Sequence, residues 1–486
     1  MLDIKFKKII VYGLGISGIS TLKFFAINLI NSQIQQYELY ATDDNLENIE
    51  KAKQKLIAEN FPFLDKIIFT KNSEIIYDEK TIISFSPGIP LYFPTPHKIL
   101  EIVRKTGAKL YCDIEIFYQK NSKQNFLAIT GTNGKSTTTA LTGFIFKELN
   151  IPSELGGNIG VPSFDLPDSK NLGQSEMTYI LEMSSYQLDL IDQAHFKVAA
   201  FLNITPDHID RHGSMENYIE AKKRIFKNQM AGDYAAINID NVNSKAVFGE
   251  AKNDKNFLAT LVPVSTKEVN DGGVSTINGK LFNCIDGENS EFDLGDIFLK
   301  GEHNAENISM AFALTYCHLK QQNLLGKIEQ SQIIAAIKKF KGLRHRMQFL
   351  GSIDGVTFVN DSKATNAEST ENALKSYKDI FWILGGKAKE GGIESLVPYF
   401  NKVEKAYLIG EASDEFAKVL EENSVEFEKC GDLKTAFEKS FSDAKNRGLK
   451  EKNILLSPAC ASFDQWKNFE ERGDFFCKTF DELQNF

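Results

Sequence analysis

Short apolar runs that end in glycine or polar loops recur along the whole chain, and helical patterns separate them. Each run has four to six residues, the length of a buried strand, and turn residues bound it. Strands that alternate with helices favour parallel α/β sheets, whose polar loops meet at one edge. The runs that carry this pattern are residues 8–12, 38–42, 81–85, 126–129, 177–181, 197–202, 356–360, 380–384, 406–409 and 453–456.

These runs fall into three groups, and 486 residues suit about three domains at ~150 residues each. We predict domains at 1–112, 113–341 and 342–486. Residues 240–300 differ, because Asn278-Gly279 and Asp286-Gly287 separate short alternating runs, as in β-hairpins. The fold class is therefore α/β, with Rossmann-like first and third domains. The central domain is a P-loop ATPase-type parallel sheet with a β-rich extension.

Composition excludes several classes of function. The net charge of −9 argues against a general nucleic-acid surface. The six cysteines show no CxxC or Cys/His metal spacing, as expected for reduced thiols in a cytoplasmic protein. Glycines interrupt the apolar run at residues 9–22, so we interpret it as strand–turn–helix and not as a signal peptide. No other stretch approaches ~18 uninterrupted apolar residues, and we expect no membrane span.

The clearest motif is Gly131-Thr-Asn-Gly-Lys-Ser-Thr137, which follows the strand at 126–129 and opens a helix to about Leu149. Strand, glycine loop, lysine, hydroxyl and helix form the P-loop arrangement, in which backbone N–H groups face a phosphate chain. Lys135 can reach the outer phosphates, and Ser136 or Thr137 can hold Mg²⁺. Ile129 stands where the usual motif begins with glycine, so this is a shorter variant. The alternative is a glycine turn with a surface lysine.

Two further strand ends in the central domain carry polar chemistry. Glu182 ends the run at 177–181, where a carboxylate can serve Mg²⁺. The run at 197–202 leads into a loop, residues 203–213, with two histidines, two aspartates and an arginine. Its ligand types are too mixed for zinc. The following helix, predicted over 215–230, carries Lys222 and Lys223, and Gly156-Gly-Asn-Ile-Gly160 is predicted to be a flexible loop.

The first domain contains Gly13-Leu-Gly-Ile-Ser-Gly18, with acidic residues Asp43 and Asp44 after the next strand. The spacing is close to that of a dinucleotide fingerprint. A glycine loop after a first strand also accepts the pyrophosphate of a nucleotide sugar. Both ligands remain open on this motif alone.

Together these motifs resemble the Mur ligases of peptidoglycan synthesis, and the resemblance covers the three domains in order. The P-loop is joined by Leu181-Glu-Met-Ser-Ser-Tyr-Gln-Leu188, Asp207-His208, His303-Asn304, Asn360-Asp-Ser-Lys-Ala-Thr-Asn366 and Ser457-Pro-Ala-Cys-Ala-Ser-Phe-Asp-Gln-Trp-Lys-Asn-Phe469. The last motif is similar to that of the D-glutamate-adding branch. The resemblance implies a monomeric cytoplasmic ligase that joins D-glutamate to UDP-N-acetylmuramoyl-L-alanine through an acyl phosphate.

The resemblance also implies a role for each domain and for individual residues. Lys135, Glu182, His208 and Lys222 would be catalytic. Two Mg²⁺ ions would use Ser136, Glu182, His208 and Lys222, the last as a carbamate formed with CO₂. ATP would contact Gly131, Thr132, Asn133, Gly134, Lys135, Ser136, Thr137, Asn304, Asn307, Arg346 and Asp361. The UDP-sugar would contact Gly15, Ile16, Ser17, Asp43, Gly88 and Asn158. D-glutamate would contact Lys363, Thr365, Lys389, Ser462 and Phe469.

Three alternatives stay open at this point. One is a ligase of the same family that adds another amino acid, or a folylpolyglutamate-type ligase. The second is a nicotinamide-dependent dehydrogenase based on residues 13–18 and Asp43, which leaves Lys135 and Glu182 without a role. The third is a non-enzymatic P-loop switch, which needs no acyl acceptor for turnover.

Overall fold

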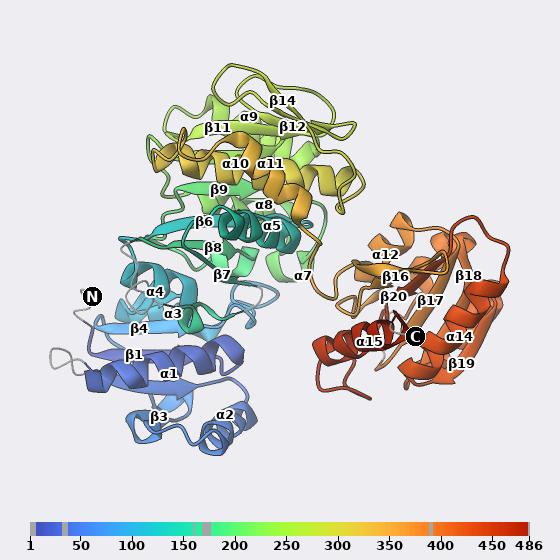
Figure 1. Cartoon of the computed structure of the whole chain (residues 1–486). Helices are drawn as coiled ribbons and strands as arrows, with labels where there is room; N and C mark the ends of the chain where they lie inside the picture. The colour runs from blue at the N-terminus through green and yellow to red at the C-terminus, as the bar shows by residue number, and fades with distance from the viewer. Residues whose placement is uncertain (1–5, 32–36, 159–160, 168–175, 388–391, 485–486) are drawn as a thin grey trace. The chain divides into compact units, whose positions relative to one another are not determined.

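The computed structural model describes residues 6–31, 37–158, 161–167, 176–387 and 392–484. The chain divides into two compact units, residues 1–340 and 341–486 (Figure 1). Among the described residues, no helix combines the length and apolar character needed to cross a membrane. The division at 112/113 within the first unit remains a prediction.

The first sheet is parallel, in the order β3-β2-β1-β4-β5. Alternate residues of β1 enter different cores: Ile9 and Val11 pack with α1, whereas Ile10 and Tyr12 pack on the other face. Both faces of the sheet are thus covered, as parallel sheets require. The strands are β1 (Lys8–Tyr12), β2 (Glu38–Thr42), β3 (Ile67–Phe69), β4 (Thr81–Phe85) and β5 (Lys109–Tyr111). The helices are α1 (Ile16–Asn31), α2 (Leu46–Ala58), α3 (Lys98–Thr106) and α4 (Asp113–Lys120).

The central sheet has nine strands in the order β14-β13-β12-β11-β10-β9-β6-β8-β7. Its core is continuous with that of the first sheet, since Phe117, Phe126 and Tyr179 belong to one cluster with Ile10. The strands are β6 (Asn125–Thr130), β7 (Ser153–Gly157), β8 (Thr178–Glu182), β9 (Val198–Phe201), β10 (Tyr234–Asn238), β11 (Thr260–Ser265), β12 (Val274–Ile277), β13 (Lys280–Asn283) and β14 (Ser290–Asp293). The helices are α5 (Lys135–Glu148), α6 (Ser185–Leu188), α7 (Ile209–His212), α8 (Met215–Lys223), α9 (Val242–Asn253), α10 (Glu302–Gln321) and α11 (Gln330–Lys339). Helices α5 and α10 pack against each other (Figure 1).

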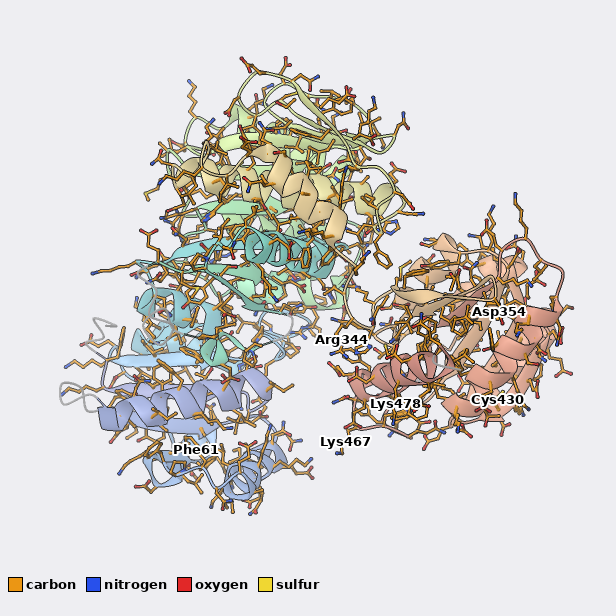
Figure 2. The ribbon with its side chains drawn as sticks, in the orientation of Figure 1. Phe61, Arg344, Asp354, Cys430, Lys467 and Lys478 are labelled. Carbon is orange, nitrogen blue, oxygen red and sulfur yellow. The ribbon has the colours of Figure 1, made fainter. Side chains whose placement is uncertain are left out.

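The C-terminal unit holds a six-stranded sheet in the order β15-β16-β20-β17-β18-β19, parallel except for the first pair. In Figure 2, the labelled Asp354 lies in the turn after β15 and the labelled Cys430 lies in β19, so they mark its two edge strands. The strands are β15 (Gln348–Ile353), β16 (Val356–Asn360), β17 (Ile380–Gly385), β18 (Val403–Ile409), β19 (Phe427–Gly431) and β20 (Asn453–Leu456). The helices are α12 (Ala367–Ser376), α13 (Ser413–Glu422), α14 (Leu433–Asn446) and α15 (Phe469–Gln484).

The α/β class and the hairpins of the β-rich extension are confirmed, because β12, β13 and β14 pair antiparallel. Two local predictions are wrong. The helix predicted over 215–230 ends at Lys223 and continues as a 3₁₀ turn, where the Arg224 guanidinium donates to the carbonyls of Leu188 and Ile191. Residues 156–157, predicted as a flexible loop, belong to the edge strand β7.

Candidate active site

The phosphate loop lies between the end of β9 and helix α10. Gly131 and Gly134 have φ of +154° and +84°, and α5 begins at the next residue, Lys135. A Cβ on Gly131 would lie 2.8 Å from Leu202 Cβ, and one on Gly134 would lie 2.4 Å from Asn307 Oδ1. Close packing therefore requires both glycines. The first turn of α5, with buried Ser136 and half-buried Thr137, presents its N–H groups beside this loop.

Two lysines from separate motifs converge on one carbonyl of the loop. Lys135 Nζ donates to Gly131 O at 2.9 Å and to Thr132 O at 2.8 Å. Lys222 Nζ, from α8, donates to the same Gly131 O at 2.8 Å and to Thr130 Oγ1 at 3.3 Å. Burial lowers the pKa of Lys222 well below its usual value, and the positive charge of Lys135 lowers it further. The two lysines thus share one carbonyl, and Lys222 loses its proton more readily than an exposed lysine.

Glu182 places in the same region a carboxylate with one oxygen that is free to accept a further bond. The residue is 2% exposed, and Asn158 Nδ2 donates to its Oε1 at 3.0 Å. Among the described residues, its buried Oε2 has no hydrogen-bond partner. A Cβ on Gly157 would lie 2.3 Å from Glu182 O, so glycine there permits the close approach of β7 that places Asn158. An unpartnered buried carboxylate oxygen fits a Mg²⁺ ligand.

His208 begins helix α7 with a left-handed backbone, φ +54°. Its side chain is 48% exposed, and its Nε2 lies 3.4 Å from Asp207 Oδ2. The Tyr186 ring lies 5.2 Å from those of both His208 and His212. Burial lowers the pKa of His212 to about 4, and the charges of His208 and Lys222 act in the same direction. His208 and Lys222 both lie beside Tyr218, whose ring centre is 6.3 Å from that of His208 and 4.8 Å from Lys222 Nζ.

Asn307 of α10 lies against Gly134 of the phosphate loop, and Asn304 lies one turn before it on the same helix. Asn307 Oδ1 accepts a hydrogen bond from Thr138 Oγ1 at 3.1 Å, and Asn307 Nδ2 donates to Asn304 Oδ1 at 3.3 Å. No group of three histidine, cysteine or acidic side chains placed to hold a metal occurs in the described parts of the chain. Mg²⁺ here would depend on phosphate and water oxygens beside Glu182, which is how Mg²⁺ is commonly bound.

In the first domain, the predicted UDP-sugar residues lie at the ends of β1, β2 and β4. Helix α1 begins at Ile16, which is 75% exposed, beside an exposed Gly15 and a half-buried Ser17. The Asp43 carboxylate is already engaged: Oδ2 accepts from Leu14 N at 2.9 Å, and Oδ1 accepts from Asn45 N at 3.0 Å. Asp43 therefore shapes the glycine loop.

The C-terminal unit gathers most of its predicted residues around β16. Asp361 is buried, accepts from Met347 N at 3.0 Å and Ser457 Oγ at 2.7 Å, and burial raises its pKa to about 7. Lys363 Nζ lies 5.8 Å from the centre of the Phe469 ring. The buried Nη1 of Arg346 has no hydrogen-bond partner among the described residues. Thr365 is half-buried and Ser462 is buried, whereas Lys389 lies outside the described residues.

Two residues of the loop after β9 escaped individual assignment from the sequence. Asn203 contacts the phosphate loop, with its Oδ1 accepting from Asn133 N at 2.9 Å. Arg211 donates to Gly88 O and Pro87 O, both at 3.2 Å, and its guanidinium carbon lies 4.4 Å from the centre of the Tyr186 ring. The many polar residues in 203–213 indicate a functional loop in the sequence. The roles of Asn203 and Arg211 depend on partners that are distant in sequence, so the sequence alone does not predict them.

Comparison with known proteins agrees with this architecture. Residues 129–315 match the model of the Mur ligase middle domain, and residues 345–460 match that of the Mur ligase glutamate ligase domain. Two solved structures share the fold at 15% identity. One is the UDP-N-acetylmuramate–alanine ligase of Thermotoga maritima, with a TM-score of 0.51 and coverage of 98% of this chain and 99% of that chain. The other is a UDP-N-acetylmuramoyl-L-alanyl-D-glutamate–2,6-diaminopimelate ligase, with a TM-score of 0.53 and coverage of 92% and 96%.

Curated relatives match over nearly the full length of the chain, and those named here are called UDP-N-acetylmuramoylalanine–D-glutamate ligase. The protein of Wolbachia pipientis wMel is 38% identical over 99% of this chain and 97% of its own. The protein of Rickettsia prowazekii is 39% identical over 98% of both chains. That of Rhodospirillum rubrum is 38% identical over 96% of this chain and 92% of its own. The chain belongs to the Mur ligase family.

Proposed function

We propose that this protein uses ATP to join D-glutamate to UDP-N-acetylmuramoyl-L-alanine, in the synthesis of peptidoglycan precursors. The observation that carries the proposal is the convergence of Lys135 and Lys222 on Gly131 O, in a chain similar over its full length to ligases of that name. A nicotinamide dehydrogenase leaves this lysine pair without a role. We expect a cytoplasmic monomer, and the six free cysteines suit a reducing compartment.

The chemistry follows from the poor electrophilicity of a carboxylate. One oxygen of the alanyl carboxylate attacks the γ-phosphorus of ATP, and the bond to ADP breaks, which gives an acyl phosphate. The amine of D-glutamate then attacks the acyl carbon, loses a proton, and inorganic phosphate leaves. Two anions must approach closely in the first step, so positive charge is needed to offset their repulsion. Lys135 and the N–H groups in the first turn of α5 supply part of it.

Mg²⁺, when bound, neutralises phosphate charge and orients the oxygens that react. We propose two ions, held by the Ser136 hydroxyl, Glu182, His208 and Lys222 as a carbamate. The unpartnered Oε2 of Glu182 and the lowered pKa of Lys222 support this set. An ammonium cannot bind a cation, whereas a carbamate can.

Substrate binding divides among the three predicted domains. We propose that residues 1–112 bind the UDP-sugar through Gly15, Ile16, Ser17 and Gly88, with Asp43 shaping the loop and Asn158 adding a contact from residues 113–341. ATP binds to the phosphate loop, residues 131–137 of the central domain, together with Asn304, Asn307, Arg346 and Asp361. Residues 342–486 bind D-glutamate through Lys363, Thr365, Lys389, Ser462 and Phe469.

The test is phosphate release by the purified full chain with ATP, Mg²⁺ and UDP-N-acetylmuramoyl-L-alanine. D-glutamate should stimulate release, whereas L-glutamate, L-alanine, glycine and diaminopimelate should not. A strict requirement for another amino acid would assign the protein to a different branch of the family. Turnover that needs no amino acid would favour a P-loop switch.

Arg211→Ala should raise the KM for the UDP-sugar about tenfold or more and change the KM for ATP little. The guanidinium holds the carbonyls of Pro87 and Gly88, so the N–H of the trans Pro87–Gly88 peptide points away from it and is available, we propose, to the UDP-sugar. Hydrogen bonds to a charged donor contribute about 1.5–3 kcal/mol. Steady-state kinetics with each substrate varied in turn measures the effect.

Lysine at position 211 should recover part of the loss, because it keeps the charge but lacks the planar fork of donors. Arg104→Ala, on the exposed side of α3, is the matched control and should leave both KM values unchanged. Equal increases in the KM for ATP and for the UDP-sugar would contradict a specific role at residues 87–88.

A further inference from the structure

Asn203 holds the phosphate loop through three backbone groups. Its carbonyl accepts from Thr132 N at 2.7 Å, and its side-chain Oδ1 accepts from Asn133 N at 2.9 Å. Its Nδ2 donates to Asn133 O at 3.3 Å. One residue just after β9 thus holds three successive peptide groups of the loop. The N–H groups of Thr132 and Asn133 point into the protein, which leaves those in the first turn of α5 to face a phosphate.

Glu306, on α10, acts with the backbone of Asn133 to fix which way the Asn203 amide faces. Asn203 Nδ2 donates to Glu306 Oε1 at 2.9 Å. If the amide rotated by 180°, its oxygen would face the carboxylate and its NH₂ would face the N–H of Asn133, and all three side-chain hydrogen bonds would be lost. The carboxylate therefore adds to the preference for one of the two amide orientations, the one that the loop needs.

A direct contact between Glu306 and a nucleotide phosphate is disfavoured. Glu306 lies near two further acids, Asp240 and Glu302, and burial together with their charges raises its pKa. The negative charge of this acidic cluster, which raises the pKa of Glu306, also repels phosphate oxygens. Its hydrogen bonds run instead to the side chains of Asn203 and Asn238, on the protein side of the loop.

We propose that Asn203 and Glu306 form a positioning pair that presets the phosphate loop for ATP, with Glu306 acting through Asn203. The inference rests on the proposed function only in naming ATP as the ligand. It predicts that breaking the pair weakens nucleotide binding while the UDP-sugar site keeps its affinity. The reason is that the hydrogen bonds of Asn203 described above all run to the phosphate loop and to α10, and not to the loop at residues 87–88.

The test is a double-mutant cycle on the full chain, read as the Kd for MgATP by calorimetry. Asn203→Asp keeps the shape but places a carboxylate against Glu306, and should weaken MgATP binding at least tenfold. Glu306→Gln alone should change it less than threefold, since its amide oxygen still accepts from Asn203. The double variant Asn203→Asp, Glu306→Gln should bind several-fold tighter than Asn203→Asp, because the amide introduced at position 306 then donates to the carboxylate introduced at position 203.

Two further measurements keep the outcomes distinct. Glu306→Ala, which frees the amide to rotate, should weaken MgATP binding about three- to tenfold and is the fallback if Asn203→Asp does not fold. Asn253→Asp, at the exposed end of α9, makes the same charge change and should have no effect. An Asn203→Asp protein with wild-type affinity, or a double variant no better than the single one, overturns the inference. Failure of the wild-type protein to bind MgATP would instead overturn the proposed function.

Discussion

Lys135→Ala is expected to lower kcat for phosphate release by about 10²–10³-fold, the loss seen when one preorganised charge-stabilising donor is removed. The Lys135 ammonium donates to the carbonyls of Gly131 and Thr132, both in the phosphate loop. Phosphate oxygens are stronger acceptors than these carbonyls, so the ammonium turns to a bound nucleotide at little cost. Because charge on the transferring phosphoryl grows in the transition state, kcat should fall more than the affinity for ATP.

The controls for this prediction lie on the same helix. Lys147→Ala removes a lysine from the exposed last turn of α5 and should leave kcat unchanged. Lys135→Arg retains the charge with a different shape and should keep more activity than the alanine variant. Retention of a tenth or more of wild-type kcat by Lys135→Ala, with the fold intact by circular dichroism, would remove this lysine from the mechanism.

The parts of the fold that the sequence predicted well are those where local pattern and tertiary packing agree. The runs at 8–12, 356–360 and 453–456 have the bounds of β1, β16 and β20, because each is an apolar run between clear turn signals. The edge strand β7 was missed because Ser153–Gly157 has two glycines and a poor strand composition. Glycine is needed at position 157 because the backbone there passes close to Glu182 of β8. Only the pairing of β7 with β8 reveals this contact.

Residue types in the site were predictable, but the way they are held was not. Local motifs identify Glu182, at a strand end, and Lys135, in a glycine loop. Asn203 and Glu306 lie 103 positions apart, and their hydrogen bond depends on the packing of α10 beside the loop. Likewise, Asp43 matched a ligand-binding spacing, yet its oxygens accept backbone N–H groups of its own domain. The spacing of a motif therefore predicts which residues lie near a site, whereas the hydrogen bonds in the folded protein show what each of them binds.

Lys222→Ala is expected to reduce kcat by about 10²–10³-fold, and short carboxylates such as acetate should restore part of it. A neutral amine has the lone pair that attacks the carbon of CO₂; the N–C bond forms and one proton leaves. Burial and the nearby Lys135 lower the pKa of Lys222, which raises its neutral fraction at neutral pH. In the alanine variant, acetate entering the vacated space would return the missing carboxylate beside Glu182.

A measurement independent of turnover separates this chemistry from a purely structural lysine. With ¹³C-bicarbonate, the wild-type protein should show a carbamate carbon signal by NMR that Lys222→Ala lacks. Lys223→Ala is the matched control: its partly exposed side chain pairs with Glu220 and Glu250, and its loss should leave both the signal and kcat unchanged. If the signal is absent from the wild type and no carboxylate rescues Lys222→Ala, Lys222 acts as an amine through its hydrogen bond to Gly131 O, and the second metal ion must find other ligands.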